Sequence, residues 1–210
     1  MNSLDIDAIR AAPVVAEPFP HIIVKHAVPP DALAAVEKDL PPLTRRGSFP
    51  LSSVRLGPHA KSLMAALEGD AFRNAIAGLF GLDLDDAPVM VTLRGRTDLR
   101  DGHIHTDSLA KRVTVLLYLN REAESYQGHQ GHLRLLRGPS NLEDYAVEVP
   151  PVDGTLLVFP NGPNTWHGHH TYVGRRYAVQ LNYMTTDGRA KSELRRHRVS
   201  ALVKRLLPAA

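Results

Sequence analysis

The spacing of apolar residues changes near residue 88, and the two parts of the chain predict different secondary structure. Before that point, apolar residues recur every three or four positions, which places them on one face of a helix. Three runs have this spacing: PPDALAAVEKDL (29–40), HAKSLMAAL (59–67) and DAFRNAIAGLFGL (70–82). A short apolar run, PHIIVKH (20–26), predicts a strand at the start. Residues 1–87 are therefore predicted to be largely helical.

From residue 88 onward the apolar residues fall in short runs rich in β-branched and aromatic side chains. Turn residues separate the runs, which is typical of a β-sandwich or barrel, with a jelly roll as one candidate. The runs are PVMVTLRG, RVTVLLYLN, GHLRLLRG, YAVEVPP, GTLLVFP and RRYAVQLNYM. Because no linker separates these runs from the helical part, we predict one domain over residues 1–210.

Composition excludes several classes of protein. The 210 residues contain no cysteine, which rules out disulfides, thiolate metal sites and cysteine nucleophiles. No run approaches the roughly 18 apolar residues that a membrane span needs. The first 20 residues contain early acids and no continuous apolar run, so they do not resemble a signal peptide. We therefore predict a cytoplasmic protein without a membrane span.

Positive charge is concentrated near the end of the sequence. Residues 189–205 contain seven Lys or Arg and one Glu, so this segment carries +6, whereas the whole chain carries +3. The spacing predicts a basic, amphipathic helix over 189–207. Such a helix can contact acidic surfaces, nucleic acid or membrane. The simpler alternative, which we favour, is a terminal helix packed on the barrel with its basic face in solvent; no nucleic-acid-binding motif is present.

Seven of the eleven histidines lie between residues 103 and 170, and five of these seven fall in two clusters. In the first, HIHTD, an extended strand would place His103, His105 and Asp107 on the same face. The second, WHGHH (166–170), lies between the runs GTLLVFP and RRYAVQLNYM. Both clusters therefore lie at the edges of predicted strands, where functional sites are often built.

Together the clusters offer a metal-ligand set that neither offers alone. A single histidine on a strand is more often a surface or hydrogen-bonded residue, and His-x-Asp alone recurs by chance. His105 and Asp107, joined by a histidine about 60 residues later, supply two imidazoles and one carboxylate. This set suits non-haem Fe(II), which keeps open positions for a bidentate keto acid and O₂.

A keto acid bound to such a metal would need a partner for its second carboxylate. Burying that charge requires a cation, and the planar guanidinium of arginine suits a carboxylate best. Arg176 lies nine residues after His167 at the start of the next predicted strand, on the same face as Gln180. The alternative is that Arg175 and Arg176 form a solvated turn after Gly174.

The order of these motifs resembles that of the 2-oxoglutarate/Fe(II)-dependent oxygenases. The resemblance is closest to the prolyl-hydroxylase-like branch, and PFPHIIVKHAVPPDAL is similar to the opening of its bacterial members. It covers residues 17–186 and rests on H-x-D, TVLLYLN, GHLRL, DGTLLVFP, WHG and GRRYAVQLNY in this order. It implies an α+β, mainly β fold: a double-stranded β-helix (jelly roll) over residues 88–185, with N-terminal helices as support.

The resemblance also implies roles for individual residues. His105, Asp107 and His167 match the iron ligands, and Arg176 and Tyr118 match the residues that bind the distal carboxylate of 2-oxoglutarate. The weaker matches are Thr114 and Gln180 for the wall of that pocket and Arg94, His103 and His169 for substrate contacts.

The chain also departs from the family pattern in two places. Family members often have Gly-Gly-Glu-Leu where this chain has Gly131-His132-Leu133. The cluster WHGHH also contains His169 and His170, either of which could be the third metal ligand in place of His167. The Trp-His-Gly context and the phase relative to Arg176 both favour His167.

These observations predict a dioxygenase that uses Fe(II) and 2-oxoglutarate, with ascorbate as a further candidate cofactor. It would hydroxylate an unactivated C–H bond of a small-molecule, sugar-derived or peptidyl substrate and release succinate and CO₂. The loops expected to set specificity are 43–57, 94–103 and 121–130. Two alternatives remain open: a zinc-type hydrolase with the same ligands, and a cupin using His103 and His105, although residues 106–110 lack the expected glutamate.

Overall fold

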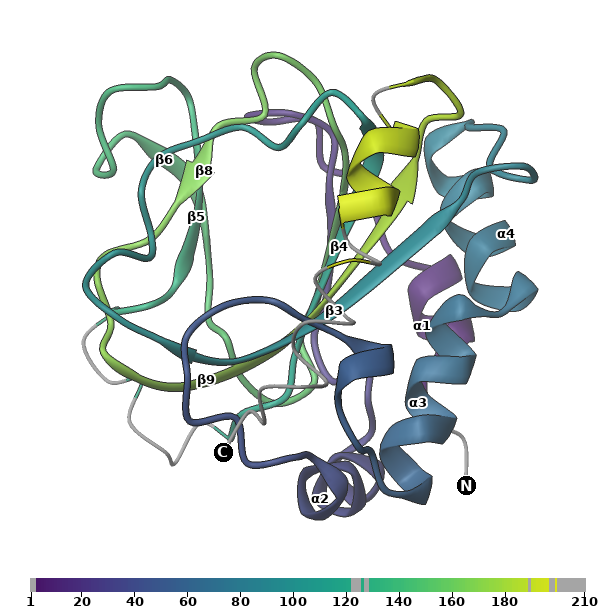
Figure 1. The fold of residues 1–210 in the computed structure, drawn as a ribbon. Coiled ribbons are helices and arrows are strands. Elements are labelled where there is room, and N and C mark those ends of the chain that lie inside the picture. Colours follow the sequence, from purple (N-terminus) through teal and green to yellow (C-terminus); the bar gives the residue numbers. More distant parts are fainter. Residues whose placement is uncertain (1–2, 122–125, 127–128, 189, 197–198, 200–210) are drawn as a thin grey trace.

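Two antiparallel sheets lie opposite each other, and helices cover the outer side of the larger sheet (Figure 1). The computed structural model describes residues 3–121, 126, 129–188, 190–196 and 199. The larger sheet has the strand order β1 (Ile22–Val24), β7 (Leu156–Pro160), β4 (Lys111–Tyr118), β9 (Gly174–Met184), β3 (Val89–Thr97) and β2 (Phe49–Pro50). The smaller sheet has the order β6 (Tyr145–Val149), β5 (Leu133–Leu136) and β8 (His167–Gly168).

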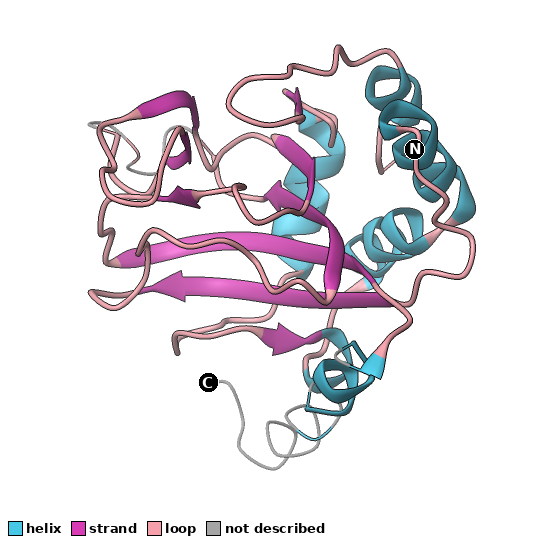
Figure 2. Cartoon of the chain, turned by 90° about the horizontal axis from the view of Figure 1, so that it is seen from above, coloured by secondary structure: helices cyan, strands magenta, loops and turns pink. Residues whose placement is uncertain are grey.

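Helices α1 to α4 belong to the N-terminal part of the chain, and Figure 2 shows helices in cyan beside the strands in magenta. The N-terminal helices are α1 (Ile6–Arg10), α2 (Pro30–Asp39), α3 (Pro58–Glu68) and α4 (Asp70–Phe80), with a 3₁₀ turn, η1, at Leu51–Ser53. Helices α2 and α3 both begin with proline, whose missing N–H costs nothing at the first helical position. Helix α4 ends at Gly81, whose φ of 62° is the left-handed conformation that glycine adopts most readily.

Alternation along the central strands gives the larger sheet two different faces. On β9, Val179 and Leu181 belong to the core beneath the helices, together with Leu63 of α3 and Ile76 of α4. Each of these side chains is essentially inaccessible to solvent, and burial of a residue of this size stabilises the fold by about 1.5–3 kcal/mol. The next residues along, such as Ala178, point to the other face, toward the smaller sheet.

The same alternation brings polar residues into the space between the sheets. On β4, Val113, Val115 and Leu117 pack under the helices, whereas Thr114 and Tyr118 face the interior. Part of that interior is an apolar core, which consists of Phe19, Tyr118, Leu133, Leu135, Val149, Leu157, Phe159 and Ala178. The remaining part is the cavity described below.

The prediction of a mixed, mainly β chain is confirmed, and the two antiparallel sheets are consistent with the double-stranded β-helix fold. The expectation that HIHTD forms an extended strand is wrong, because only His105 pairs there, through an isolated bridge to His167. Strand β3 extends to Thr97, so the first residues of the predicted loop 94–103 are strand. The short elements α1, β2 and β8 were not predicted, since they contain too few residues to show a periodic pattern.

Residues 190–196 of the predicted basic helix over 189–207 are helical, and the rest of that helix, apart from Val199, lies outside the described residues. Ala190 is buried against Ala110 and Met184, which gives the start of this segment an apolar contact with the sheet. No helix in the described part of the chain is long and apolar enough to cross a membrane.

Candidate metal and co-substrate site

A cavity of about 360 Å³ lies between the two sheets. It is lined by inward-facing residues of β4 and β9 of the larger sheet, by β8 of the smaller sheet and by residues of the segment 100–107. The residues that line it are Arg94, Arg100, Asp101, Gly102, His103, His105, Asp107, Lys111, Thr114, Leu116, Tyr118, Leu133, His167, Gly168, His169, Arg176, Ala178 and Gln180. Every residue that the sequence assigned to metal, co-substrate or substrate binding is among them.

The two histidine clusters meet at one backbone bridge. The N–H of His105 donates to the carbonyl of His167 at 3.0 Å, and the N–H of His167 donates back at 2.9 Å. Their rings lie 4.4 Å apart between centroids. Asp107 follows two residues later, and one ligand atom from each of the three side chains lies within 4.8 Å of the others. Residues 60 positions apart thus form one group of two imidazoles and a carboxylate.

Hydrogen bonds fix which ring nitrogen of each histidine is free. Nδ1 of His105 lies 2.8 Å from the carbonyl oxygen of His103, and Nδ1 of His167 lies 2.9 Å from that of Thr165. A carbonyl oxygen only accepts, so each Nδ1 carries the proton. The Nε2 lone pair of each ring is then available, and metal-bound histidines are commonly oriented in this way. The group therefore fits a divalent transition metal.

Asp107 is held by two donors. The hydroxyl of Thr114 donates to one carboxylate oxygen and the ammonium of Lys111 to the other, both at 2.6 Å. Burial raises the pKa of the Asp107 carboxyl, but the charge of Lys111 and the hydrogen bonds from Lys111 and Thr114 outweigh this effect, so the pKa lies below its ordinary value. Asp107 is thus ionised at neutral pH, as a metal ligand must be.

Thr114 was predicted to line the co-substrate pocket, but its hydroxyl is fully used beneath Asp107. It donates to Asp107 and accepts from the side-chain amides of Asn161 at 2.8 Å and Asn182 at 3.0 Å. Thr114 therefore positions the Asp107 carboxylate, a role that the sequence pattern did not indicate.

Replacing Thr114 with valine is expected to weaken metal binding by about 10- to 100-fold. The substitution removes the donor to Asp107 and leaves the buried amide of Asn182 without its acceptor, which costs about 1–3 kcal/mol of folding stability. Equilibrium dialysis of Mn(II) measures the first effect, and urea unfolding measures the second. Thr97→Val is the matched control, since the Thr97 hydroxyl is buried without a hydrogen-bond partner in the described structure. Equal metal affinity in both variants would contradict this role for Thr114.

Arg176 and Tyr118 place two unsatisfied polar groups in the cavity. Arg176 is 6% exposed, and its Nε donates to the carbonyl of Gly131 at 2.9 Å. Its guanidinium lies over the Tyr118 ring at 5.1 Å. Arg176 Nη2 and the Tyr118 hydroxyl are both buried and have no hydrogen-bond partner among the described residues. Buried donors are rarely left unpaired, and both groups can donate to an anion that enters the cavity.

The cavity mouth is polar and carries both signs of charge. Arg94 pairs with Asp101 at 3.3 Å, and Asp101 also faces Arg46 at 3.6 Å. The backbone here is tightly packed, because a Cβ on Gly102 would lie 2.3 Å from the carbonyl oxygen of His169. His103 is exposed at the rim. Of the loops expected to set specificity, only 94–103 lines this cavity among the described residues, and Leu43 and Thr44 line a separate pocket.

Two buried histidines should make folding sensitive to acid. Burial, with nearby positive charge, lowers the pKa of His167 and of His169 from the ordinary 6.5 to about 4. The folded state then binds fewer protons than the unfolded state between these values. The free energy of unfolding of the metal-free protein is therefore expected to fall from pH 6.5 to about 4, by about 3 kcal/mol per histidine, and to level off below. Urea titrations should show a smaller loss for His169→Gln, and an unchanged loss would contradict the assignment.

Residues 96–184 match the 2OG-Fe(II) oxygenase superfamily, and this stretch contains both histidine clusters and Arg176. Over these residues the chain is similar to this superfamily. The chain has a fold similar to that of a Pseudomonas putida prolyl-4-hydroxylase, with a TM-score of 0.55 and 19% identity over 86% of this chain and 91% of that one. A prolyl 4-hydroxylase from *Phytophthora capsici* has a TM-score of 0.59 and 16% identity, over 98% and 76% of the two chains.

A third oxygenase structure, the *Trichoplax adhaerens* prolyl hydroxylase in complex with a hypoxia inducible factor peptide fragment, has a TM-score of 0.52 and 16% identity, over 91% of each chain. At these identities the comparison concerns the fold alone. No curated protein matches the sequence. The superfamily match implies an oxidoreductase that uses Fe(II) and 2-oxoglutarate, and the group His105, Asp107 and His167 is consistent with that chemistry.

Sequence reasoning missed several residues of the site. Lys111 pairs with Asp107, four positions away. The side-chain amides of Asn161, just after β7, and of Asn182, in β9, both donate to the Thr114 hydroxyl. Strand alternation places Asn182 on the same face as Arg176 and Gln180, but it does not indicate the contact of Asn182 with Thr114. Nothing in the sequence marks Asn161, because its contact with Thr114 depends on the pairing of β4 with β7.

Proposed function

We propose that His105, Asp107 and His167 hold Fe(II), and that Arg176 and Tyr118 bind the distal carboxylate of 2-oxoglutarate. The observation that carries this proposal is the pair of unsatisfied donors, Arg176 Nη2 and the Tyr118 hydroxyl, in the same cavity as the ligand group. A zinc hydrolase or a cupin has no need of a buried cation and a buried hydroxyl without partners. An anionic co-substrate supplies the acceptor that both donors lack.

When Fe(II) and 2-oxoglutarate are bound, the metal centre supplies the oxidation of a C–H bond by O₂, coupled to release of succinate and CO₂. The chain's own contribution is orientation. His105 and His167 present Nε2 because their Nδ1 protons are held by backbone carbonyls. Thr114 and Lys111 fix the plane and the charge of Asp107.

The cavity wall separates the polar groups from water. Leu116, Leu133 and Ala178 line the cavity between the ligand group and the apolar core. Phe159 packs against the ring of His167, with 5.3 Å between centroids. These apolar contacts lower the local dielectric, which strengthens the attraction between Arg176 and a carboxylate. Thr114 and Gln180 complete the wall of the proposed co-substrate pocket.

We further propose that the reaction is hydroxylation of a small-molecule, sugar-derived or peptidyl substrate. The mouth of the cavity supports direct contacts of the substrate with Arg94, His103 and His169. The neighbours of similar fold include prolyl hydroxylases, which makes a peptidyl substrate one member of this range. A requirement for ascorbate stays a prediction, as does a location in the cytoplasm.

We also propose that residues 1–210 form one domain, with a jelly-roll core over 88–185, a helical support over 1–87 and a basic helix over 189–207. Support comes from the continuous core that joins the helices to the larger sheet. Apolar helix faces need such a partner surface.

An anaerobic titration tests the proposed function. The Fe(II)-loaded protein should develop a metal-to-ligand charge-transfer absorption band when 2-oxoglutarate is added, because the keto acid then chelates the iron. Succinate added at the same concentration is the control and should give no band, since it lacks the 2-oxo group. If 2-oxoglutarate also gives no band with iron bound, the co-substrate assignment fails and the hydrolase and cupin alternatives return.

A further inference from the structure

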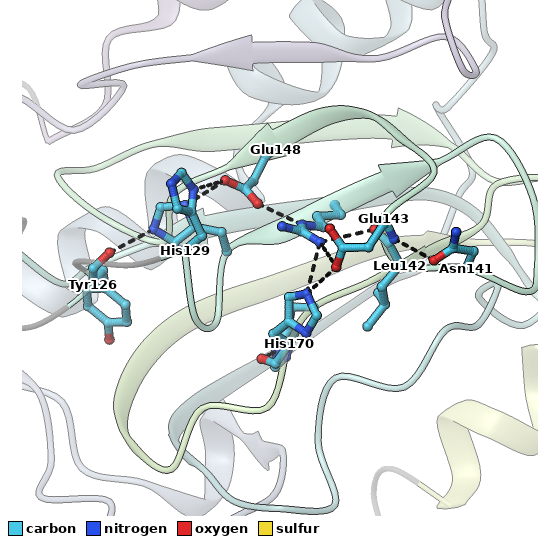
Figure 3. A network of polar contacts seen from close by, with 10 residues as sticks. Tyr126, His129, Asn141, Leu142, Glu143, Glu148 and His170 are labelled. Atoms are coloured by element: carbon cyan, nitrogen blue, oxygen red, sulfur yellow. Dashed lines mark hydrogen bonds and ion pairs between the residues drawn. The ribbon is translucent and has the colours of Figure 1, made fainter.

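A second group of metal-ligating residues lies beside the smaller sheet, and none of its members lines the cavity; Figure 3 shows two of them, His129 and Glu148, in contact. Glu148 of β6 stands opposite Arg134 of β5, and His132 is two residues before Arg134. The intervening residue Leu133 faces the interior and lines the cavity. By strand alternation, His132, Arg134 and Glu148 therefore share the outer face of this sheet.

The group offers two imidazole nitrogens and one carboxylate oxygen. Nδ1 of His129 contacts Oε1 of Glu148, and Nδ1 of His132 lies 3.4 Å from the same oxygen. One ligand atom from each of the three residues lies within 4.8 Å of the others. His129 is exposed, whereas the side chains of His132 and Glu148 are only 13% and 12% exposed.

The hydrogen bonds of His132 leave a lone pair facing the carboxylate. Nε2 of His132 lies 3.2 Å from the carbonyl oxygen of Tyr126, which only accepts, so Nε2 carries the proton. In the neutral ring, Nδ1 then presents its lone pair to Oε1 of Glu148. Two acceptors that face each other require a cation between them, which is either a metal ion or a second proton on the ring.

Arg134 orients the carboxylate for this contact. Its Nε donates to Oε2 of Glu148 at 2.7 Å, which leaves Oε1 toward the two histidines. Arg134 is in turn held by Glu143 at 2.8 Å and packs over the ring of Tyr145 at 4.3 Å. Outer partners of this kind commonly fix the ligands of metal sites.

We propose that His129, His132 and Glu148 form a second metal site, which binds Zn²⁺. Two imidazoles and one carboxylate form a ligand set that zinc accepts, and zinc's preference for four ligands leaves one position for water. Mg²⁺ and Ca²⁺ prefer oxygen ligands and would not select this group.

Zinc at this site would connect His129 and His132, which precede β5, to Glu148 of β6. Residues near these two histidines also contact the start of β9. The Tyr126 hydroxyl donates to the carbonyl of Arg175 at 2.5 Å, and the carbonyl of Gly131 accepts from Arg176. Gly131, which precedes His132, therefore links the second site to Arg176, the residue proposed to bind 2-oxoglutarate. The metal affinity of the second site does not depend on that role.

The test uses a protein that lacks the first site. In the His105→Ala/Asp107→Ala variant, competition of Zn²⁺ with a chromophoric chelator should show one remaining equivalent of tightly bound zinc. Adding His132→Ala or His129→Ala should weaken this binding by more than about 100-fold, since each removes a ligand. His170→Ala is the matched control, because His170 belongs to the same polar network through Glu143 but offers no atom to the metal group.

Circular dichroism checks that each variant is folded. His129 is largely exposed, so its replacement keeps the test valid even if His132→Ala unfolds the protein. Absence of tightly bound zinc in the folded variant without the first site would overturn the proposal and assign a proton to the position between His132 and Glu148. Retention of zinc after His129→Ala would also overturn it.

Discussion

Replacing Asp107 with alanine is expected to abolish both substrate oxidation and 2-oxoglutarate decarboxylation. Asp107 supplies the carboxylate of the group that it forms with His105 and His167. Without it, two neutral imidazoles remain beside Lys111, whose charge repels a divalent cation. We expect the purified variant to bind iron at least about 100-fold more weakly. Iron content and succinate release measure the two effects.

Asp101→Asn is the matched control for this experiment. Asp101 lines the same cavity but pairs with Arg46 and Arg94 at its mouth. This variant should keep its iron, because Asp101 lies outside the proposed ligand group. If Asp107→Ala turned over 2-oxoglutarate at the rate of the unaltered protein, the assignment of the metal site would be wrong.

Replacing Arg176 with alanine is expected to weaken 2-oxoglutarate binding by about two to three orders of magnitude. Removing one partner of a buried ion pair costs about 3–5 kcal/mol, and each 1.4 kcal/mol corresponds to about tenfold in the dissociation constant. Metal affinity should stay nearly unchanged, since Arg176 offers no metal ligand. Calorimetric titration of 2-oxoglutarate into the Mn(II)-loaded protein measures the affinity without turnover.

The neighbouring residue provides the control. Arg175 is exposed and lies over the ring of Tyr177 on the opposite face of β9, with 5.0 Å to the ring centroid. Arg175→Ala should leave 2-oxoglutarate affinity within about twofold, as is usual for exposed charges. Equal 2-oxoglutarate affinities in the two variants would show that Arg176 does not bind the distal carboxylate, and only the metal site would remain.

The parts of the site that strand alternation governs could be predicted from the sequence. Alternation placed Arg176 and Gln180 on one face of β9, the family resemblance added Thr114 and Tyr118 of β4, and all four line the cavity. Alternation of side chains between the two faces of a strand is a local property, so it can be predicted even when the partner strands are unknown.

What could not be predicted depends on contacts between distant segments. HIHTD is not a regular strand, because its only β-pairing among the described residues is the isolated bridge between His105 and His167. The use of the Thr114 hydroxyl by Asp107 depends on how the segment after Gly102 crosses β4. The group of His129, His132 and Glu148 was also missed, since Glu148 is 16 residues from His132 and approaches it only through the pairing of β5 with β6.

A crystal structure of the Mn(II) protein with N-oxalylglycine, an unreactive analogue of 2-oxoglutarate, shows directly whether one cavity binds both the metal and the co-substrate. We expect an anomalous peak for a Mn(II) ion that is bound by Nε2 of His105, Nε2 of His167 and the carboxylate of Asp107. The distal carboxylate of the analogue should accept hydrogen bonds from Arg176 and Tyr118, the two donors left unsatisfied here. A metal bound only elsewhere, or an analogue whose distal carboxylate lies away from Arg176, would contradict the proposed function.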